Sequence, residues 1–332
     1  MSYFILNDVH LGLRRKSGAT PLSLRDYQIL QINLLNKVVS EVNESASNLI
    51  INGDLLDSWQ VSYELIWAAI SALSVVKGRL ICCRGNHDLS RDQTKMSAFD
   101  MVCLLIPKAE AISSPFFLTE NCAIVPSLIN QVAFDSAIAE VVAKGATTLL
   151  AHCNFNNPFT EGKDHSLNLT PEQVAKFDHV ILGHEHQKRD LPGIDILGAP
   201  LPCSISECSK AKGYHRWEGP GHEVEFIESW NTETGYAEID WHDLHGVTAT
   251  ADFVRVVGTG EPEEAATVIQ EVARFRENCS AFFISNSVKI GDIDLSIIEE
   301  AAETDLHAFN PRAELLLALP EQYQEKMRRF LS

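Results

Sequence analysis

Residues 84–88 read Arg-Gly-Asn-His-Asp and follow directly on Leu-Ile-Cys-Cys at residues 80–83. The run is short, apolar and closely followed by a glycine, which predicts a buried β-strand ending at the polar stretch. Asn86, His87 and Asp88 then place an amide oxygen, an imidazole and a carboxylate in one turn. Such a combination is typical of a reactive site and not of a hydrophobic core.

Four other predicted strands end in the same kind of chemistry. These strands are followed or ended by aspartates and histidines: Asp8 and His10, Asp54 and Asp57, His152, and His184 and His186. Strand and helix patterns alternate over the first ninety residues, which indicates parallel strands. Ligands of open α/β sheets bind beyond the carboxyl ends of the strands. We therefore expect the five strand ends to converge on one site.

Length and composition indicate an ordinary globular protein. The chain has 332 residues, 45% of them hydrophobic and 22% charged, enough for one domain of ~200 to 250 residues and a smaller one. No apolar run approaches the ~20 residues of a membrane span, and no signal peptide precedes the first strand. We expect a cytoplasmic protein with no membrane partner, in the host cytoplasm if a phage encodes it.

The spacing of the cysteines and the net charge argue against some classes of protein. None of the eight cysteines forms a CxxC pair, so we expect buried thiols and neither a zinc ribbon nor a disulfide framework. The net charge of -18 argues against a general nucleic-acid coat protein. A nuclease with a local basic rim remains open, because cations follow three motifs: Arg14, Arg15, Lys16, Arg91, Lys95, Lys188 and Arg189. Solvated loop charges are the alternative interpretation.

The hydrophobic pattern predicts two sheets and a second unit. Helices are expected at 24–42, 60–76, 131–144 and 171–176, and a strand hairpin at 116–125. Residues 230–250 are polar and without a period, which predicts a boundary. A small α+β unit would follow, with strands at 253–257 and 282–284, a helix opened by Pro262, and a second helix at 293–302. We predict domains at 1–232 and 250–309, then C-terminal helices at 310–332.

The donor atoms predict a metal centre. Carboxylates, imidazoles and one Asn amide suit Mn²⁺, Fe²⁺ or Zn²⁺ better than Ca²⁺ or Mg²⁺. One ion cannot use all seven candidate ligands, which are Asp8, His10, Asp54, Asn86, His152, His184 and His186. Two ions ~3.5 to 4 Å apart and bridged by a carboxylate would use them, and such pairs act on phosphate esters. Any one of the seven alone would be read as a capped strand end or a structural histidine.

In this order, the motifs resemble those of the calcineurin-like metallophosphoesterases. The resemblance rests on Asp8-x-His10, Gly53-Asp54-x-x-Asp57, Gly85-Asn86-His87-Asp88, His152 and Gly183-His184-x-His186. It implies an α/β fold, a four-layer α/β/β/α sandwich. It also implies that Asp8, His10, Asp54 and His186 hold one metal and that Asp54, Asn86, His152 and His184 hold the other, with Mn²⁺ preferred.

The same resemblance assigns roles to the remaining residues. His87 would be the acid that protonates the leaving oxygen or steadies the transition state, and Asp88 would orient it. We expect Asp57 to orient a histidine ligand.

Further strings favour one branch of the family. Protein phosphatases carry Asp-Arg-Gly where residues 57–59 read Asp-Ser-Trp, and Glu in place of Asp88, which counts against them. Residues 7–12, Asn-Asp-Val-His-Leu-Gly, are similar to the start of the recombination nucleases SbcD and Mre-eleven. Leu-Gly-Ala-Pro at 197–200 with Lys-Gly-Tyr at 212–214 resembles the strand pair that ends their nuclease domain. The outline is closest to the nuclease subunit of T-even-like phages.

This resemblance implies a two-metal DNA exonuclease, with endonuclease activity as a further option, acting in recombination, repair or degradation. Residues 250–309 would cap the DNA, and residues 311–331 would dock an SMC-like ATPase similar to SbcC. Members also commonly form homodimers through helices of the nuclease domain. Two alternatives stay open. One is a small-substrate phosphodiesterase or nucleotide phosphatase with a lid. The other is a non-catalytic metal-holding scaffold, against which the intact His87 speaks.

Overall fold

The sheet that contains residues 80–83 is built from parallel strands with an antiparallel edge. The computed structural model describes residues 2–13, 21–90, 92, 94–157, 166–247, 251–291 and 293–295. In it, β3 (Leu80–Cys83) lies in a six-stranded sheet of order β14-β13-β1-β2-β3-β4. The other strands are β1 (Tyr3–Leu6), β2 (Asn48–Asn52), β4 (Ala109–Ile112), β13 (Lys212–Trp217) and β14 (Val224–Trp230). Strands β1 to β4 are parallel, and β13 pairs antiparallel to β1.

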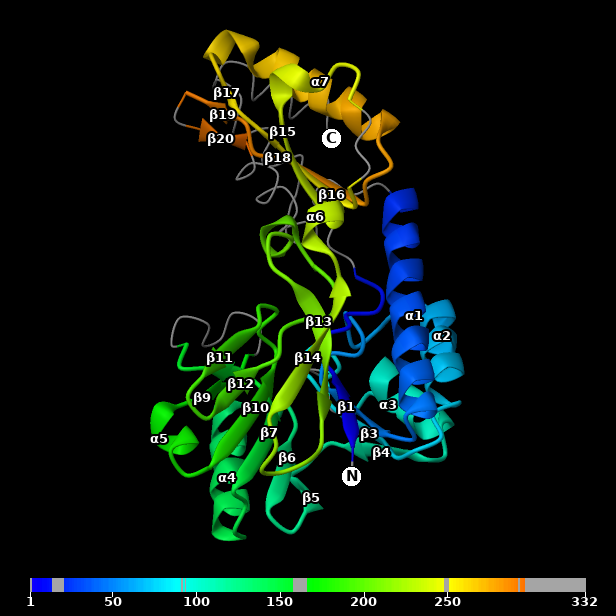
Figure 1. Cartoon of the computed structure of the whole chain (residues 1–332), viewed down its shortest axis with the longest axis vertical. Coiled ribbons are helices and arrows are strands. Elements are labelled where there is room, and N and C mark those ends of the chain that lie inside the picture. Colours follow the sequence, from blue (N-terminus) through cyan, green and yellow to red (C-terminus); the bar gives the residue numbers. More distant parts are fainter. Residues whose placement is uncertain are drawn as a thin grey trace, which may run out of the picture.

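A second six-stranded sheet packs against the first (Figure 1). Its order is β11-β12-β10-β7-β6-β5, with parallel strands in the middle and antiparallel β5 and β11 at the edges. The strands are β5 (Phe116–Thr119), β6 (Cys122–Val125), β7 (Thr148–His152), β10 (His179–Gly183), β11 (Arg189–Leu191) and β12 (Ile194–Ile196).

Alternation along the strands explains this packing. Ile5, Ile50 and Ile81 are neighbours across three strands and face the second sheet, where Leu150 and Ile181 meet them in one buried cluster. In each of these strands, the residues on either side of the inward-facing one point to the opposite face of the sheet and pack against helices. Because both faces are covered, the central strands β1, β2, β3, β7 and β10 are largely apolar and read as nearly continuous apolar runs in the sequence.

Helices cover both outer faces. The first sheet carries α1 (Pro21–Glu44), α2 (Tyr63–Leu73) and α3 (Ala98–Leu105), and the second carries α4 (Gln131–Ala143) and the short α5 (Pro171–Val174) (Figure 1). This is the expected α/β/β/α sandwich. The sequence prediction missed α3 and β4, because α3 has only eight residues and is almost uniformly apolar. No helical period is legible in such a segment. A capping box of Ser97 and Asp100 sets the start of α3.

A smaller α+β unit lies at the other end of the molecule (Figure 1). Its parallel sheet has the order β15-β16-β18, from β15 (Tyr236–Asp240), β16 (Phe253–Val257) and β18 (Phe283–Asn286). Helix α7 (Ala265–Asn278) packs its buried Val268 and Val272 onto this sheet. On the opposite face, Phe253 and Phe283 join the core of the first sheet beside Tyr27 of α1.

Short elements complete the chain. They are β8 (Asn154–Phe155), β9 (Asn168–Leu169), η2 (Ile205–Glu207), α6 (Thr232–Gly235), η3 (Trp241–Asp243), β17 (Thr259–Gly260), η4 (Pro262–Glu264), β19 (Lys289–Ile290) and β20 (Ile293–Asp294).

Two sequence-based expectations differ from the structure. The passage at 230–250 contains a strand, β15, whose hydrogen-bonding partner β16 lies further along the chain. A strand, β20, occupies 293–294, where a helix over 293–302 is predicted. The rest of that helix and the C-terminal helices at 310–332 lie outside the described residues.

Two expectations from composition can be examined directly. All eight cysteines are free and seven of them are buried, as the sequence predicts. No helix within the described part of the chain is both long enough and apolar enough to cross a bilayer.

His215 of β13 should make the stability depend on pH. Neither ring nitrogen has a hydrogen-bond partner among the described residues, and burial lowers its pKa to about 4. The unfolded chain, with a pKa near ~6.5, therefore binds more protons between these values, and stability falls as the pH drops. From pH ~7.5 to ~5 the loss should be about 2 kcal/mol. Urea unfolding in a chelator at both pH values should show that acid lowers the stability of wild type by about 2 kcal/mol more than that of His215→Leu, because the other titrating groups are common to both proteins. An equal loss in both would exclude His215 as the source.

Candidate metal centre

The predicted site residues sit at the carboxyl ends of five strands. Asp8 and His10 follow β1, Asp54 follows β2, and Asn86 and His87 follow β3. From the second sheet, His152 ends β7, and His184 and His186 follow β10. The backbone joins these loops, because the Asp8 amide donates to the carbonyl of Gly53 and the His10 amide donates to that of Asp54. The second sheet joins them, because the His184 amide donates to Asp8 Oδ2 and His152 Nδ1 lies 2.9 Å from the Asn52 carbonyl.

Asp54 lies between two groups of donors. On one side, its Oδ2 is 3.6 Å from His10 Nε2, which in turn is 3.0 Å from His186 Nε2. On the other side, the same Oδ2 is 3.2 Å from His152 Nε2. Asn86 Oδ1 lies 3.2 Å from His152 Nε2 and 2.9 Å from Nδ1 of His184.

Asp8 completes the set. Its Oδ1 is 3.9 Å from Nε2 of both His10 and His152, and its Oδ2 accepts a hydrogen bond from the backbone amide of His184. The structure thus brings all seven predicted ligands together.

Four of these seven residues have left-handed backbones. The φ angles are 50° at Asp8, 46° at His10, 47° at Asp54 and 88° at His184. A non-glycine residue in this region costs on the order of 1–3 kcal/mol and persists only where the surrounding structure enforces it. Such strain concentrates at functional sites. Here it occurs at the turns that direct the donor side chains into the common site.

The charges and donors fit divalent metal ions. Asp8 Oδ1 is fully buried and accepts no hydrogen bond within the described residues. Burial acts to lower the pKa of His152, but the carboxylates of Asp54 and Asp8 outweigh it and raise that pKa to about 9. The pKa of Asp54 is held well below its usual value, since the histidines outweigh its burial. The site therefore attracts positive charge, and its mix of carboxylate, imidazole and amide donors suits transition metals.

His87 lies beside the donors and is held by a backbone carbonyl. Its Nδ1 is 2.7 Å from the carbonyl oxygen of Asp57, and its ring stands edge-on to His10 at 4.7 Å between centroids. With Asp54, His184 and His186 it lines a cavity of about 420 Å³. Burial acts to lower its pKa, but Asp54 and the Asp57 carbonyl raise it overall. His87 is therefore favourably placed to carry a proton.

Asp88 makes different contacts from those expected. Its Oδ1 accepts from the amide of Leu56 at 3.1 Å and its Oδ2 from the amide of Gly85 at 3.0 Å. It thus ties together the loops after β2 and β3, and the partner of the His87 ring is the Asp57 carbonyl instead. Asp57 lies beside a ligand, with its Oδ1 3.2 Å from His10 Nδ1, and its role in orienting that ring stays a prediction.

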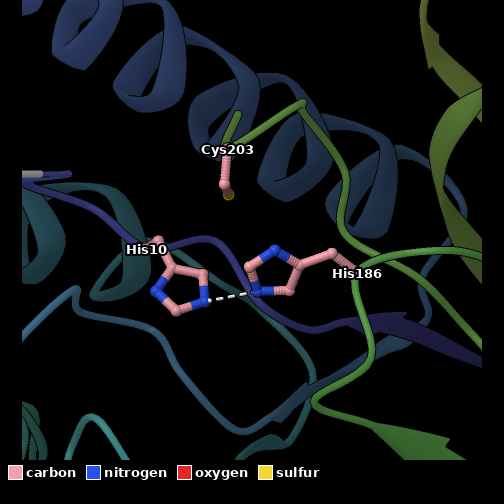
Figure 2. Close-up of side chains that lie close together, drawn as sticks. All are labelled: His10, His186 and Cys203. Carbon is pink, nitrogen blue, oxygen red and sulfur yellow. Dashed lines mark hydrogen bonds between the residues drawn. The ribbon is translucent and has the colours of Figure 1, made fainter. Parts of the chain in front are cut away.

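Three residues that the sequence prediction passed over adjoin the site. The Cys203 side chain points toward the rings of His10 and His186 (Figure 2), and its sulfur lies within 4.8 Å of a nitrogen of each. Glu207 Oε1 is 3.0 Å from His186 Nδ1, and Lys212 Nζ is 3.1 Å from Glu207 Oε2. Residues 203–212 contain three serines and a second lysine, so no pattern in the sequence distinguishes this pair.

The described cations near the site are paired with acids. Lys95 pairs with Asp92 at 3.3 Å. Lys188 pairs with Asp190, and Arg189 pairs with Glu185, and of these cations Arg189 lines the cavity. The cations at 14–16 and 91 lie outside the described residues.

Gly53 provides a test of the convergence. Its φ is +93°, and a Cβ there would lie 2.0 Å from His152 Nδ1. Gly53→Ala should therefore displace the His152 ring and weaken Mn²⁺ binding by about 10–100-fold, measured by calorimetry. Gly145→Ala is the matched control, because Gly145 has φ +90° with nothing near its Cβ among the described residues. It should lose about 1–2 kcal/mol of stability and keep its metal affinity. Equal metal affinities in both variants would contradict the arrangement.

Comparison with known proteins gives one family. Residues 1–188 match the sequence model of a family described as calcineurin-like phosphoesterase. That range covers the seven ligands and His87. No curated protein matches the chain.

Solved structures align with this chain at low identity. A dimetal phosphatase from Danio rerio aligns at 12% identity over 65% of this chain and 91% of its own, with a TM-score of 0.42. An archaeal phosphodiesterase aligns at 14% identity over 69% and 99%, with a TM-score of 0.36. A protein of Thermus thermophilus aligns at 11% over 69% and 99%, with a TM-score of 0.43. At these values the three structures say nothing about the substrate of this chain.

Proposed function

This chain belongs to the calcineurin-like phosphoesterases and is a metal-dependent phosphoesterase, and we propose that its substrate is DNA, which it cleaves with two bound metal ions. The observation that carries the two-metal proposal is the position of Asp54 between two sets of donors. Asp8, His10, Asp54 and His186 would hold one ion, and Asp54, Asn86, His152 and His184 the other. Mn²⁺ is the proposed metal, because the set combines imidazoles with carboxylates.

When bound, two such ions would polarise the phosphate and make a water molecule more acidic. The protein's own residues supply orientation and a proton. His152 donates Nδ1–H to the carbonyl of Asn52 at 2.9 Å, which leaves Nε2 as the ligand atom. His87 Nδ1 is engaged by the Asp57 carbonyl, so its Nε2 is the atom that would protonate the leaving oxygen.

DNA is favoured over a small substrate by the sequence beyond the ligands. Residues 7–12 and the pair of strings at 197–200 and 212–214 resemble those of recombination nucleases of the SbcD and Mre-eleven type. The α+β unit follows the sandwich where those nucleases carry a cap. Strand β1 runs from the N-terminus toward that unit (Figure 1), so the unit lies at the end of the sandwich where the ligand loops emerge.

We propose an SMC-like ATPase as partner and a homodimer as the assembly. The net charge of -18 makes DNA binding by this chain alone unfavourable, and a partner would supply positive charge.

For the dimer, helices α2 and α3 pack side by side and expose large apolar side chains. Trp67 is 69% exposed and Leu104 68%, and Tyr63 and Leu105 are exposed as well. Apolar exposure of this kind marks interaction surfaces.

Degradation of an end-labelled DNA duplex with Mn²⁺ tests the proposal. Wild type and His87→Ala are each assayed with and without an SbcC-like ATPase and ATP, beside bis-p-nitrophenyl phosphate. Loss of label with wild type only, enhanced by the ATPase, supports the nuclease. Turnover of the small ester with intact DNA in every mixture would contradict it and favour a small-substrate phosphodiesterase.

A further inference from the structure

A buried ion pair lies behind His186, on the side away from the other ligands. Glu207 is 7% exposed and Lys212 is 1% exposed. Charges this deeply buried are costly unless paired and hydrogen-bonded. Neither residue is among the seven ligands, although Glu207 borders the cavity that His87 and His186 also line. Their burial therefore needs a reason of its own.

Side-chain hydrogen bonds of the pair lead to His186 or fix Glu207. Glu207 Oε1 faces His186 Nδ1 at 3.0 Å and also accepts from Ser204 Oγ at 3.0 Å. Its Oε2 accepts from the Cys203 amide at 3.0 Å and from Lys212 Nζ at 3.1 Å. Lys212 Nζ donates as well to the carbonyl oxygen of His186, at 2.6 Å. The pair thus holds His186 by both its ring and its backbone.

The ring contact decides which nitrogen of His186 is free. With Nδ1–H directed at Glu207, Nε2 keeps its lone pair, and Nε2 is the atom that faces His10 Nε2. A carboxylate behind a ligating histidine fixes the tautomer and orientation and raises the basicity of the imidazole. We propose that Glu207, held by Lys212, positions His186 as a metal ligand; this inference rests on the two-metal function proposed above.

Glu207 is anchored from the second unit too. It ends the short helix η2 (Ile205–Glu207), which contacts strands β16 and β18 of the small sheet. Cys203 and Cys208 on either side of η2 share a core cluster with Phe253 and Phe283. The carboxylate is therefore fixed between the small unit and the metal centre.

Mn²⁺ binding to chelator-stripped protein tests the inference without measuring hydrolysis. The main variant is Glu207→Met with Lys212→Met, which removes both charges together and leaves no buried charge unpaired, so it should fold. Calorimetric titration should show two sites in wild type. In the double variant, one site should bind about 10–100-fold more weakly, while the other changes little.

Two further variants separate orientation from packing. Glu207→Gln with Lys212→Met is also neutral but keeps an acceptor for His186 Nδ1–H, and it should recover part of the lost affinity. Asp252→Asn is the matched control, since Asp252 accepts from Trp230 Nε1 and belongs to the small unit; it should bind both ions as wild type does.

The outcomes of the titration distinguish the positioning role of Glu207 from the proposed two-metal function. A wild type that binds fewer than two Mn²⁺ ions would overturn the two-metal function itself. Two sites of unchanged affinity in the folded Met–Met variant would overturn the role of Glu207 and leave the function standing. A loss in that variant without recovery by Gln would also overturn it, because packing and not orientation would then be at work.

Discussion

Asp54→Asn should reduce Mn²⁺-dependent phosphodiester hydrolysis by on the order of 10³-fold and weaken both metal sites at once. Asp54 Oδ2 lies within 3.6 Å of His10 Nε2 and 3.2 Å of His152 Nε2, so one carboxylate serves both sets of donors. The amide has nearly the same shape, but it carries no charge to share between two cations. The measurements are kcat/KM for bis-p-nitrophenyl phosphate and calorimetric titration with Mn²⁺.

The fold should survive this change. Asp54 Oδ1 accepts from the His87 backbone amide at 2.9 Å, and the Asn oxygen can keep that bond. Asp92→Asn is the control, because Asp92 is an exposed carboxylate paired with Lys95, and it should behave as wild type. If Asp54→Asn weakened one site alone, Asp54 would belong to one ion and would not bridge two.

His87→Ala should lower kcat by about 10²- to 10⁴-fold, the range of general acid catalysis, while both Mn²⁺ affinities stay within a few-fold of wild type. The ring lines the cavity beside Asp54 and His186, yet its Nδ1 is taken by the Asp57 carbonyl. The motif resemblance assigns it to moving a proton. Its Nε2 is nevertheless left available, as that of His152 is, and a ligand atom of the ring lies within 4.8 Å of those of His10 and Asp54. The titration therefore tests whether it also holds an ion. Steady-state kinetics and Mn²⁺ titration on the same preparation measure the two effects.

A histidine remote from the site is the control for this change. His242 of the small unit is exposed and contacts Asp240, so His242→Ala should leave kcat unchanged. If His87→Ala bound one Mn²⁺ ion fewer, His87 would be a ligand. His87→Ala should lower kcat less for a small ester whose leaving group needs no proton than for an ester with a poor leaving group.

Local patterns in the sequence predicted many of the strands and helices, and the motif resemblance implied the four-layer sandwich. Strand β3 was predicted to the residue, because an apolar run of strand length stops at Arg84 and Gly85. Helix α4 was predicted to within one residue from its apolar period. Helix α3 and strand β15 were missed. The first is too short and apolar to show a period, and the second is recognisable chiefly by its pairing with β16.

The seven donors were found from the sequence because each follows a strand, and parallel strands bring their ends to one edge. That inference needs chain order alone. It does not give the direction of a side chain after a turn. Asp88, next to His87 in the sequence, turns to the amides of Leu56 and Gly85, while the carbonyl of Asp57, thirty residues away, holds the imidazole.

The sequence by itself determined the main strands and helices, the donor types and their meeting at one edge, because these follow from hydrophobic period and strand order. Only the tertiary structure decided that the carbonyl of Asp57 and not Asp88 holds the His87 ring, and that Glu207 and Lys212 lie behind His186. Those contacts join segments such as 186 and 207 through loops without a period, and their geometry depends on left-handed turns and on packing against the second unit. Packing of that kind leaves no pattern in the order of residues.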